Sequence, residues 1–331
     1  MIKEDFRAKE IRETFDRWSN AREDWDVAAR EDIDFYLGNH FTPDEMDELA
    51  SRNQSAVPMD RLYSAIEQFK AIITSKPPKF SAVAREDSDN KLSNVWKVIL
   101  EYIWDISEGD EQFKQAVHDY TVTGMGYFYA YIDKEADYGR GEVKFKHLNP
   151  FKVYVDPNSR ERYFGDASGI IVSHIMSKLQ LIDAYPQLAE PIEEDSEKMV
   201  IDQIDTVSEE DYPDNSNRRT MDSFTPDIVK DYDYQGSGEK YRLIEYYSKI
   251  KVPYYRLLDR RSNQEKIIPQ EQFQAMQQDK QFLNAINKGL IDFVEVQQTR
   301  IRQTGSVGQV VLYDSVLDTD MYTVVPVPNI W

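Results

Sequence analysis

The sequence predicts an α+β fold, in which N-terminal helices precede a mixed, mainly antiparallel strand-rich region that carries an acidic insertion. Two observations predict this fold class. Up to about residue 122, apolar residues recur at steps of three and four, which is the period of amphipathic helices. Beyond residue 126, short runs rich in Val, Ile, Tyr and Phe alternate with turn-forming residues, as strands and hairpins do.

Four amphipathic helices are predicted in the N-terminal part. Their approximate ranges are residues 3–37, 59–74, 89–106 and 110–122. The second helix ends before Pro77-Pro78, because proline disfavours helical backbone at the residue before it. The third helix has a broad apolar stripe, which predicts that it faces the core. This stripe contains Leu92, Val95, Trp96, Ile99, Leu100 and Ile103.

The strand pattern opens with a predicted hairpin of residues 127–133 and 142–147. Further strands are predicted at residues 151–155, 169–176, 241–251, 252–258, 292–302, 309–316 and 322–327. The run Asp156-Pro157-Asn158-Ser159 predicts a turn directly after the strand at 151–155.

Two more helices are predicted among the strands. Ser177 predicts the N-cap of a short helix that ends at Tyr185-Pro186. Pro269 predicts the start of a second helix, which runs to about Lys288 and ends at Gly289. Proline at the start and glycine after the end are typical of helices.

Residues 190–240 differ from the rest of the chain in charge, because they contain 16 acidic and 5 basic residues. A segment with this many charges buries too little apolar surface to offset the conformational entropy that it would lose on folding. It is therefore predicted to be a mobile insertion with at most one short helix. The chain is accordingly divided into a helical part (1–126), a strand-rich part (127–189), the acidic insertion (190–240) and a second strand-rich part (241–331).

The composition excludes several classes of protein. With 40 Lys and Arg against 60 Asp and Glu, the net charge is −20, which is unfavourable for gripping a phosphate backbone. The absence of cysteine excludes disulfides, thiolate zinc sites, iron–sulfur clusters and cysteine nucleophiles. No uncharged apolar run reaches about 18 residues and no signal peptide opens the chain, so no membrane contact is expected.

The familiar catalytic signatures are missing. The histidines His40, His118, His147 and His174 are scattered and show no metal-binding spacing. There is no phosphate-binding loop and no G-x-S-x-G turn, and neither Gly124-Met125-Gly126 nor Gly236-Ser237-Gly238 completes a dinucleotide fingerprint. We therefore predict no catalytic, cofactor-binding or metal-binding residue, and no cofactor.

Carboxylate pairs leave one enzymatic alternative open. Asp231-x-Asp233 and Asp318-x-Asp320 are spaced as the ligands of a metal-dependent nuclease could be. In a chain with 60 acidic residues such spacings arise by chance, so a solvated surface is the favoured interpretation. A calcium loop beginning at Asp156 is rejected, because Glu161 stands where that loop needs glycine. A third hypothesis is an acidic adaptor that binds a basic partner through residues 190–240.

Aromatic residues are concentrated in the predicted strands. They include Tyr127, Phe128, Tyr129, Tyr131, Tyr241, Tyr246, Tyr247, Tyr254 and Tyr255. One interpretation is a sandwich-type core. The other is a strand face covered by a neighbouring copy of the chain, since aromatic residues are enriched at interfaces.

Three segments resemble the portal proteins of tailed bacteriophages, most closely those of short-tailed and crAss-like phages. The first is the helix Trp25–Tyr36, which leads into the sequence DFYLGN. The second is Ala116–Tyr127, a helix that enters a glycine-broken strand. The third and most specific is His147–Ser159, a strand that enters an Asp-Pro turn. The strands at 169–174 and 244–247 follow in the order of that family.

This resemblance implies a structural subunit without catalytic activity. Copies of the chain would form a ring, typically of twelve, at one vertex of the virion capsid after assembly in the host cytoplasm. Double-stranded DNA would pass through the ring during packaging and ejection without specific binding. The implied partners are the chain itself, the large terminase subunit, the head–tail adaptor protein and the major capsid protein.

The resemblance further implies that this chain supplies the N-terminal wing part of a portal subunit. The apolar segment Val324–Trp331 resembles the strand that leads into a helical stem. We therefore expect the chain to continue beyond Trp331 into a stem that is needed for a stable ring.

Overall fold

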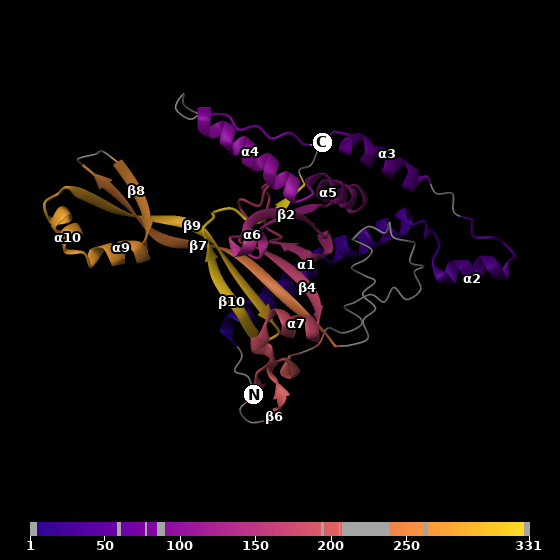
Figure 1. Cartoon of the computed structure of the whole chain (residues 1–331). Coiled ribbons are helices and arrows are strands. Elements are labelled where there is room, and N and C mark those ends of the chain that lie inside the picture. Colours follow the sequence, from indigo (N-terminus) through magenta and orange to yellow (C-terminus); the bar gives the residue numbers. More distant parts are fainter. Residues whose placement is uncertain are drawn as a thin grey trace.

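The computed structural model describes residues 5–57, 61–76, 78–84, 90–192, 195–204, 206, 239–260 and 264–327. Two antiparallel sheets form the body of the molecule, and helix α1 (Phe6–Tyr36) lies against it (Figure 1). Extensions project from the body on opposite sides. One contains the far ends of two long strands, and the other contains helix α2 (Pro43–Ser51). The predicted α+β fold is confirmed.

Helix α1 packs on the larger sheet because its apolar residues recur on one face. The buried cluster between them consists of Ile11, Phe15, Trp18, Tyr154, Ile171 and Ile244. At the start of the helix, the Asp5 carboxylate accepts a hydrogen bond from the Arg7 amide at 2.8 Å. This cap satisfies one of the backbone donors that a helix leaves unpaired at its first turn.

The other N-terminal helices are α3 (Leu62–Thr74), α4 (Asn90–Ile106) and α5 (Gly109–Thr123). All four predicted helices are therefore present. Helix α2 was not predicted, although it has a local signal. The Thr42 side chain accepts from the Glu45 amide and the Glu45 carboxylate accepts from the Thr42 amide, which is a capping box.

A smaller sheet has the strand order β11-β1-β2. Its strands are β1 (Tyr127–Asp133), β2 (Glu142–Leu148) and β11 (Val324–Pro326). Strands β1 and β2 pair antiparallel and a short turn of helix, α6 (Ala136–Gly139), lies between them, which confirms the predicted hairpin. Residues 328–331, which complete the predicted apolar C-terminal segment, lie outside the described part.

The larger sheet has the order β10-β9-β7-β4-β3, and β8 pairs with the far end of β7. Its strands are β3 (Val153–Val155), β4 (Gly169–Ser177), β7 (Lys240–Asp259), β8 (Gln264–Pro269), β9 (Ile291–Val307) and β10 (Val310–Leu317). The two strands predicted at 241–251 and 252–258 are one strand of 20 residues. Pro253 lies inside it without breaking it.

Two buried clusters hold the body together. The first joins the two sheets and includes Tyr127, Leu148, Val153, Ile170, Tyr247, Ile301 and Val324. The second lies around α7 (Lys178–Ala184) and includes Leu181, Leu188, Ile201, Tyr241 and Val307. Helix α7 begins as predicted, because Ser177 and Gln180 form a capping box.

The acidic insertion is described only at its edges. The described residues at its N-terminal edge form β5 (Pro191–Ile192), β6 (Asp195–Met199) and a 3-10 helix (Val200–Gln203), whereas at most one short helix was expected. Ile201 is fully buried in the second cluster, so apolar packing holds this edge to the body. The mobility predicted for the rest of 190–240 concerns residues that lie mostly outside the described part.

Strands β7 and β9 continue beyond the body as a ribbon, which we call the arm (residues 250–300) (Figure 1). Its outer end contains β8, α9 (Gln270–Gln277) and α10 (Lys280–Asn287), so the single helix predicted from 269 to 288 is two helices. The arm has a small core of its own, made of Leu257, Ile268, Phe273 and Phe282. Four residue pairs, from Ile250–Arg300 to Pro253–Gln297, join this end to the body; we call them the neck.

Candidate functional site

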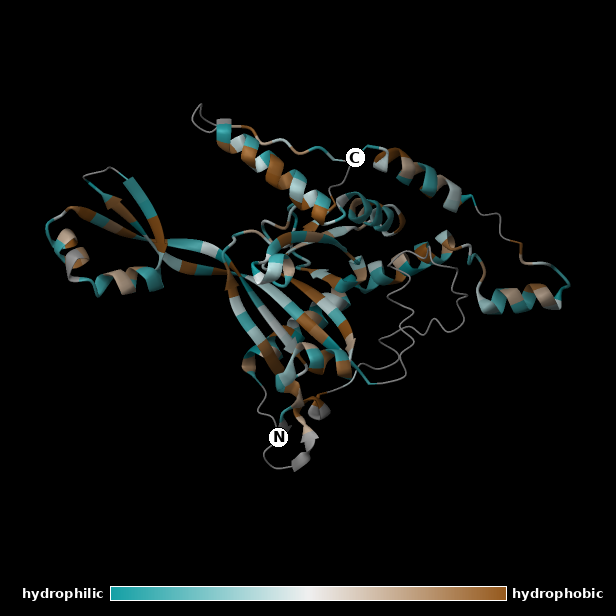
Figure 2. Cartoon of the chain, in the orientation of Figure 1, coloured by the Kyte–Doolittle hydropathy of each residue, from teal (hydrophilic) through white to brown (hydrophobic). Residues whose placement is uncertain are grey.

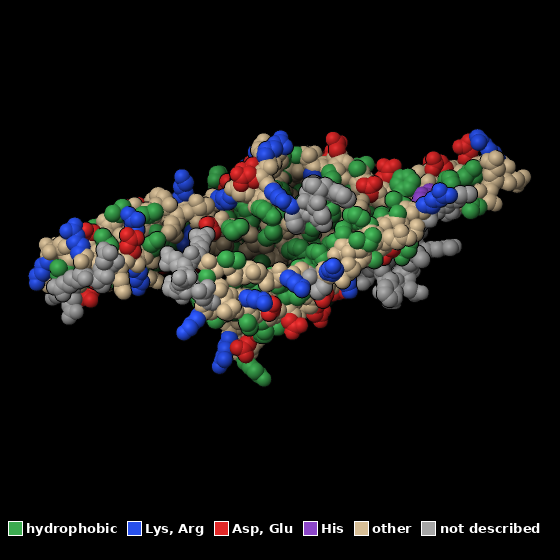
Figure 3. Space-filling view, turned by 90° about the horizontal axis from the view of Figure 1, so that it is seen from above, with side chains coloured by type: hydrophobic (Ala, Val, Ile, Leu, Met, Phe, Trp, Pro, Cys, Tyr) green, Lys and Arg blue, Asp and Glu red, His purple; other side chains and the backbone are tan. Residues whose placement is uncertain are grey.

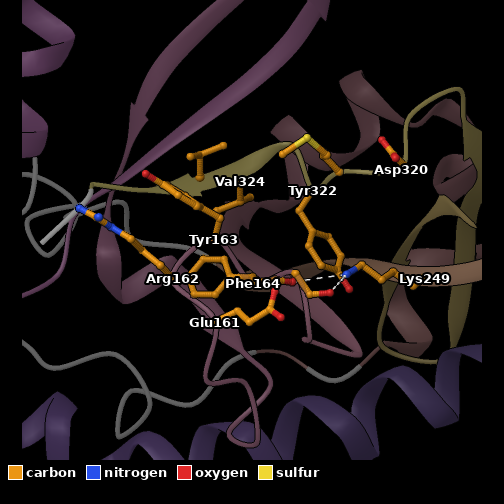
Figure 4. A pocket seen from close by; sticks show the side chains of 11 residues that line it. Glu161, Arg162, Tyr163, Phe164, Lys249, Asp320, Tyr322 and Val324 are labelled. Carbon is orange, nitrogen blue, oxygen red and sulfur yellow. Dashed lines mark hydrogen bonds between the residues drawn. The ribbon is translucent and has the colours of Figure 1, made fainter.

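A cleft of about 370 Å³ lies between the loop of residues 161–165 and the segment of residues 320–325 (Figure 4). Lys249 of β7 lies at one side of this cleft. Its other lining residues are Glu161, Arg162, Tyr163, Phe164, Gly165, Asp320, Met321, Tyr322, Val324 and Val325. Most of these side chains are apolar or aromatic.

Two polar side chains of the cleft, Lys249 and Tyr322, are bound to backbone oxygens. The Lys249 ammonium donates to the carbonyls of Phe164 and Gly165 and lies 4.9 Å from the centre of the Tyr322 ring. The Tyr322 hydroxyl donates to the Ala167 carbonyl at 2.8 Å, and burial raises the pKa of this phenol above its usual value. Lysine and tyrosine therefore fasten the loop to the sheet, and the lining residues do not form a nucleophile–base pair.

The histidines do not converge on one site. On β2, the His147 ring bonds to the Asp119 carboxylate of α5. His118, also on α5, is buried, and burial lowers its pKa to about 4. His174 lies 3.9 Å from Glu245, and His40 lies beside the Phe35 ring. Within the described part of the chain, His, Asp and Glu side chains do not form a group of three or more that could hold a metal ion.

The carboxylate pairs give no support to a nuclease site. Asp318 forms an ion pair with Arg300 at 3.2 Å, whereas Asp320 lines the cleft. Asp231 and Asp233 lie outside the described residues. The Asp156 carboxylate accepts from the backbone amides of Asn158 and Ser168, so this segment is a turn, as predicted.

Sequence reasoning missed a partly buried polar network that links the strands of the larger sheet. The Glu245 carboxylate accepts from the hydroxyls of Tyr247 and Tyr313. Gln303 donates to the Tyr247 hydroxyl at 3.1 Å, and the Tyr129 hydroxyl lies 3.0 Å from that same oxygen. These groups satisfy one another's hydrogen-bonding capacity, so the network stabilises the junction of the two sheets. The only sequence signal was the spacing of tyrosines around a lone glutamate.

Several of the strand aromatics belong to the core of the chain itself. Tyr127, Tyr241 and Tyr247 are buried in the two clusters of the body. For these residues the core interpretation is confirmed.

Helix α4 instead carries several exposed apolar side chains. Five of them, Leu92, Val95, Trp96, Ile99 and Tyr102, are 37–55% exposed, and we call these five the α4 face. The prediction that this helix faces the core is wrong for these side chains. Helical period shows which residues share a face, but not what covers that face.

Many hydrophobic side chains are visible on the side of the molecule that carries α4 (Figure 3). Seen from above, hydrophobic side chains gather around a hollow in the middle, and many charged side chains lie at the margins and on the extensions (Figure 3). Among the described helices, none is both long enough and apolar enough to cross a membrane.

The family model of phage P22-like portal proteins matches residues 12–331. The chain belongs to this family. The match spans α1, both sheets and the arm, so it covers the whole described architecture except the first residues of α1. A search of curated proteins found no match.

Membership makes this chain a structural portal protein of a bacteriophage, associated with the capsid vertex and with DNA packaging. It confirms the portal resemblance seen in the sequence. Portal proteins of this kind are oligomeric, which gives exposed apolar surface on the isolated subunit a physical reason.

Proposed function

We propose that copies of this chain form the ring, with about twelve subunits, that serves as the conduit for genome packaging and ejection at one capsid vertex. The observation that carries this proposal is the family match over residues 12–331. The exposed α4 face supports it, because a soluble subunit with this much apolar surface on one helix is suited to self-assembly.

The charge of the chain suits a conduit. At −20 per copy, the chain repels phosphates, so DNA is not held by stable contacts while it moves. At physiological salt the field reaches only about 8 Å from the surface, so the residues nearest the channel dominate this effect.

Residues 1–126, 127–189 and 241–331 would belong to the wing of the portal subunit, and residues 190–240 would form an acidic insertion within it. The proposed partners are further copies of the chain, the large terminase subunit, the head–tail adaptor protein and the major capsid protein. The proposed location is the portal vertex of the virion, reached from the host cytoplasm during assembly.

Negative-stain microscopy and mass photometry of the full-length protein, with the expected stem included, test this proposal. We expect closed rings with a central hole. A protein that remains monomeric across a wide concentration range in both measurements would overturn it.

A nuclease assay separates the proposal from the enzymatic alternative. Plasmid DNA incubated with the protein and magnesium should remain intact. Cleavage that disappears when Asp318 and Asp320 are changed to Asn would favour the nuclease hypothesis instead.

A further inference from the structure

The five side chains of the α4 face form a continuous stripe. Their spacing of three, four, seven and ten residues from Leu92 places them on one side of a helix. Val95 and Trp96 are each 53% exposed, so the stripe is open at its middle. Figure 2 shows apolar residues along α4, which stands off the top of the body.

This exposure does not arise from a loosely attached helix. At the C-terminal end of α4, the Trp104 ring lies 5.2 Å from the Phe145 ring and 5.3 Å from the Phe80 ring. The Trp104 indole donates to Asp110 at 3.0 Å, and the Tyr102 hydroxyl donates to Glu142 at 2.6 Å. One end of the helix is thus anchored to β2 and α5, and this anchoring holds the α4 face in a fixed position.

The charge of α4 favours another copy of the same chain as the occupant of this face. Residues 90–106 contain two Lys and two acidic residues, and so have no net charge in a chain of −20. Lys97 and Glu101 neutralise each other on the helix surface at 3.7 Å. A neutral apolar surface offers no attraction to nucleic acid or to a basic partner, but it lets two acidic copies approach where their repulsion is weakest.

We propose that the α4 face is one half of the contact between adjacent copies in the assembly. This inference rests on the proposed ring. A closed ring of more than two copies needs a contact between two different surfaces, so the α4 face of one copy meets another surface of the next copy. Trp96 lies at the centre of the stripe, where a buried aromatic residue contributes most to binding.

Site-specific crosslinking tests the location of the contact. The chain has no cysteine, so Val95→Cys creates a single attachment point for a photoactivated crosslinker. We expect crosslinked dimers and higher multimers from this variant. Val27→Cys on α1, where Val27 is 59% exposed, is the matched control and should give at least fivefold less multimer. Equal crosslinking from both positions would overturn the proposal.

A double variant tests whether the face is needed for assembly. Val95→Gln with Trp96→Gln preserves charge and helix propensity and changes only exposed side chains, so the subunit should fold with unchanged helix content. We expect ring formation to fall by at least tenfold. The control pair, Val27→Gln with Val83→Gln, removes two exposed valines elsewhere and should assemble normally.

Mixing the double variant with the unmodified protein tests the head-to-tail geometry. The variant loses the α4 face but keeps the second surface, which meets the α4 face of a neighbouring copy. It can therefore bind one end of a growing chain of subunits, and growth stops there. We expect a small fraction of variant to convert rings into short open oligomers. A variant that stays monomeric without disturbing the unmodified protein would overturn the head-to-tail contact, and a variant that forms rings would overturn the role of the face. If the unmodified protein forms no rings, the proposed function itself fails.

Discussion

Arg22 shows how one side chain can dock a helix on a sheet. Its guanidinium donates to the carbonyls of Pro150 at 3.1 Å, Phe151 at 3.0 Å and Val153. The same group lies 3.8 Å from the centre of the Tyr154 ring. Only arginine presents several donors in one plane, so this position ties α1 to the start of β3 in a way that lysine cannot reproduce.

Arg22→Lys should therefore lower the free energy of unfolding by about 2 to 3 kcal/mol, because at least two buried carbonyls lose their donors. Thermal and denaturant unfolding measure this loss. Arg52→Lys is the control, since Arg52 pairs with Glu48 on an exposed surface, and it should cost less than about 0.5 kcal/mol. Equal losses for the two variants would contradict the docking role.

His118 makes stability depend on pH. Burial lowers its pKa to about 4, against 6.5 for the ordinary side chain, and neither ring nitrogen bonds to a described residue. Above pH 6.5 both the folded and unfolded states hold the ring neutral, so it imposes no penalty. Below pH 6.5 the unfolded state takes up the proton first, and stability falls until the folded state is protonated near pH 4.

His118→Phe should remove this dependence, because the phenyl ring keeps the contact with Tyr36 and cannot be protonated. Between pH 7 and pH 5 the unmodified protein should lose about 2 kcal/mol more stability than the variant. Urea unfolding at both pH values measures the difference. Parallel losses in the two proteins would show that His118 is not the group responsible.

At the scale of elements, local signals predicted the fold well and long-range pairing was predicted poorly. The β1–β2 hairpin and the Ser177 cap follow from adjacent residues, and both are present. Strand β8 was missed because its sequence is short and polar, and it is a strand only through pairing with β7. The break predicted between residues 251 and 252 is absent, since the pairing of β7 with β9 continues across it and across Pro253.

The outer end of the arm should be a separate cooperative unit, because its small core is remote from the body. In that core Phe273 stacks on Tyr255 with ring centres 4.0 Å apart. Phe273→Ala should lower the free energy of unfolding of the outer end of the arm by about 3 to 5 kcal/mol. It should leave the main unfolding transition of the body unchanged. Hydrogen exchange should show lost protection in residues 254–294 and normal protection in β4.

Ile170→Ala is the control for this prediction, because Ile170 is fully buried between the two sheets. This substitution should instead lower the midpoint of the main unfolding transition. If Phe273→Ala shifts the main transition as strongly as Ile170→Ala does, the arm and the body unfold as one unit.

At the scale of the whole molecule, charge is distributed unevenly. Residues 190–240 carry 16 acidic against 5 basic residues, whereas the arm carries 8 basic against 6 acidic residues. Sequence alone predicted the portal family. It did not locate the candidate contact surface, because the apolar stripe of α4 has the same period whether the chain itself or a neighbour covers it.

Assembly should strengthen with salt, since copies of a −20 chain repel one another and the proposed contact is apolar. Raising the salt concentration from about 0.01 M to about 0.1 M shortens the screening length from about 30 Å to about 10 Å. Mass photometry across this range should show more rings and fewer monomers. Rings that dissociate as salt rises would show that ion pairs, not apolar contacts, hold the copies together.

The neck is a thin connection between the body and the outer end of the arm. Between Ile250 and Pro253, β9 is the only described strand that pairs with β7, whereas nearer the body and nearer the tip other strands also pair with this ribbon. We expect the ribbon to bend more easily at the neck than elsewhere, because among the described residues no third strand pairs with it there. We therefore expect the outer end of the arm to move as a rigid unit about the neck. Its position relative to the body can adjust while the two sheets keep their shape.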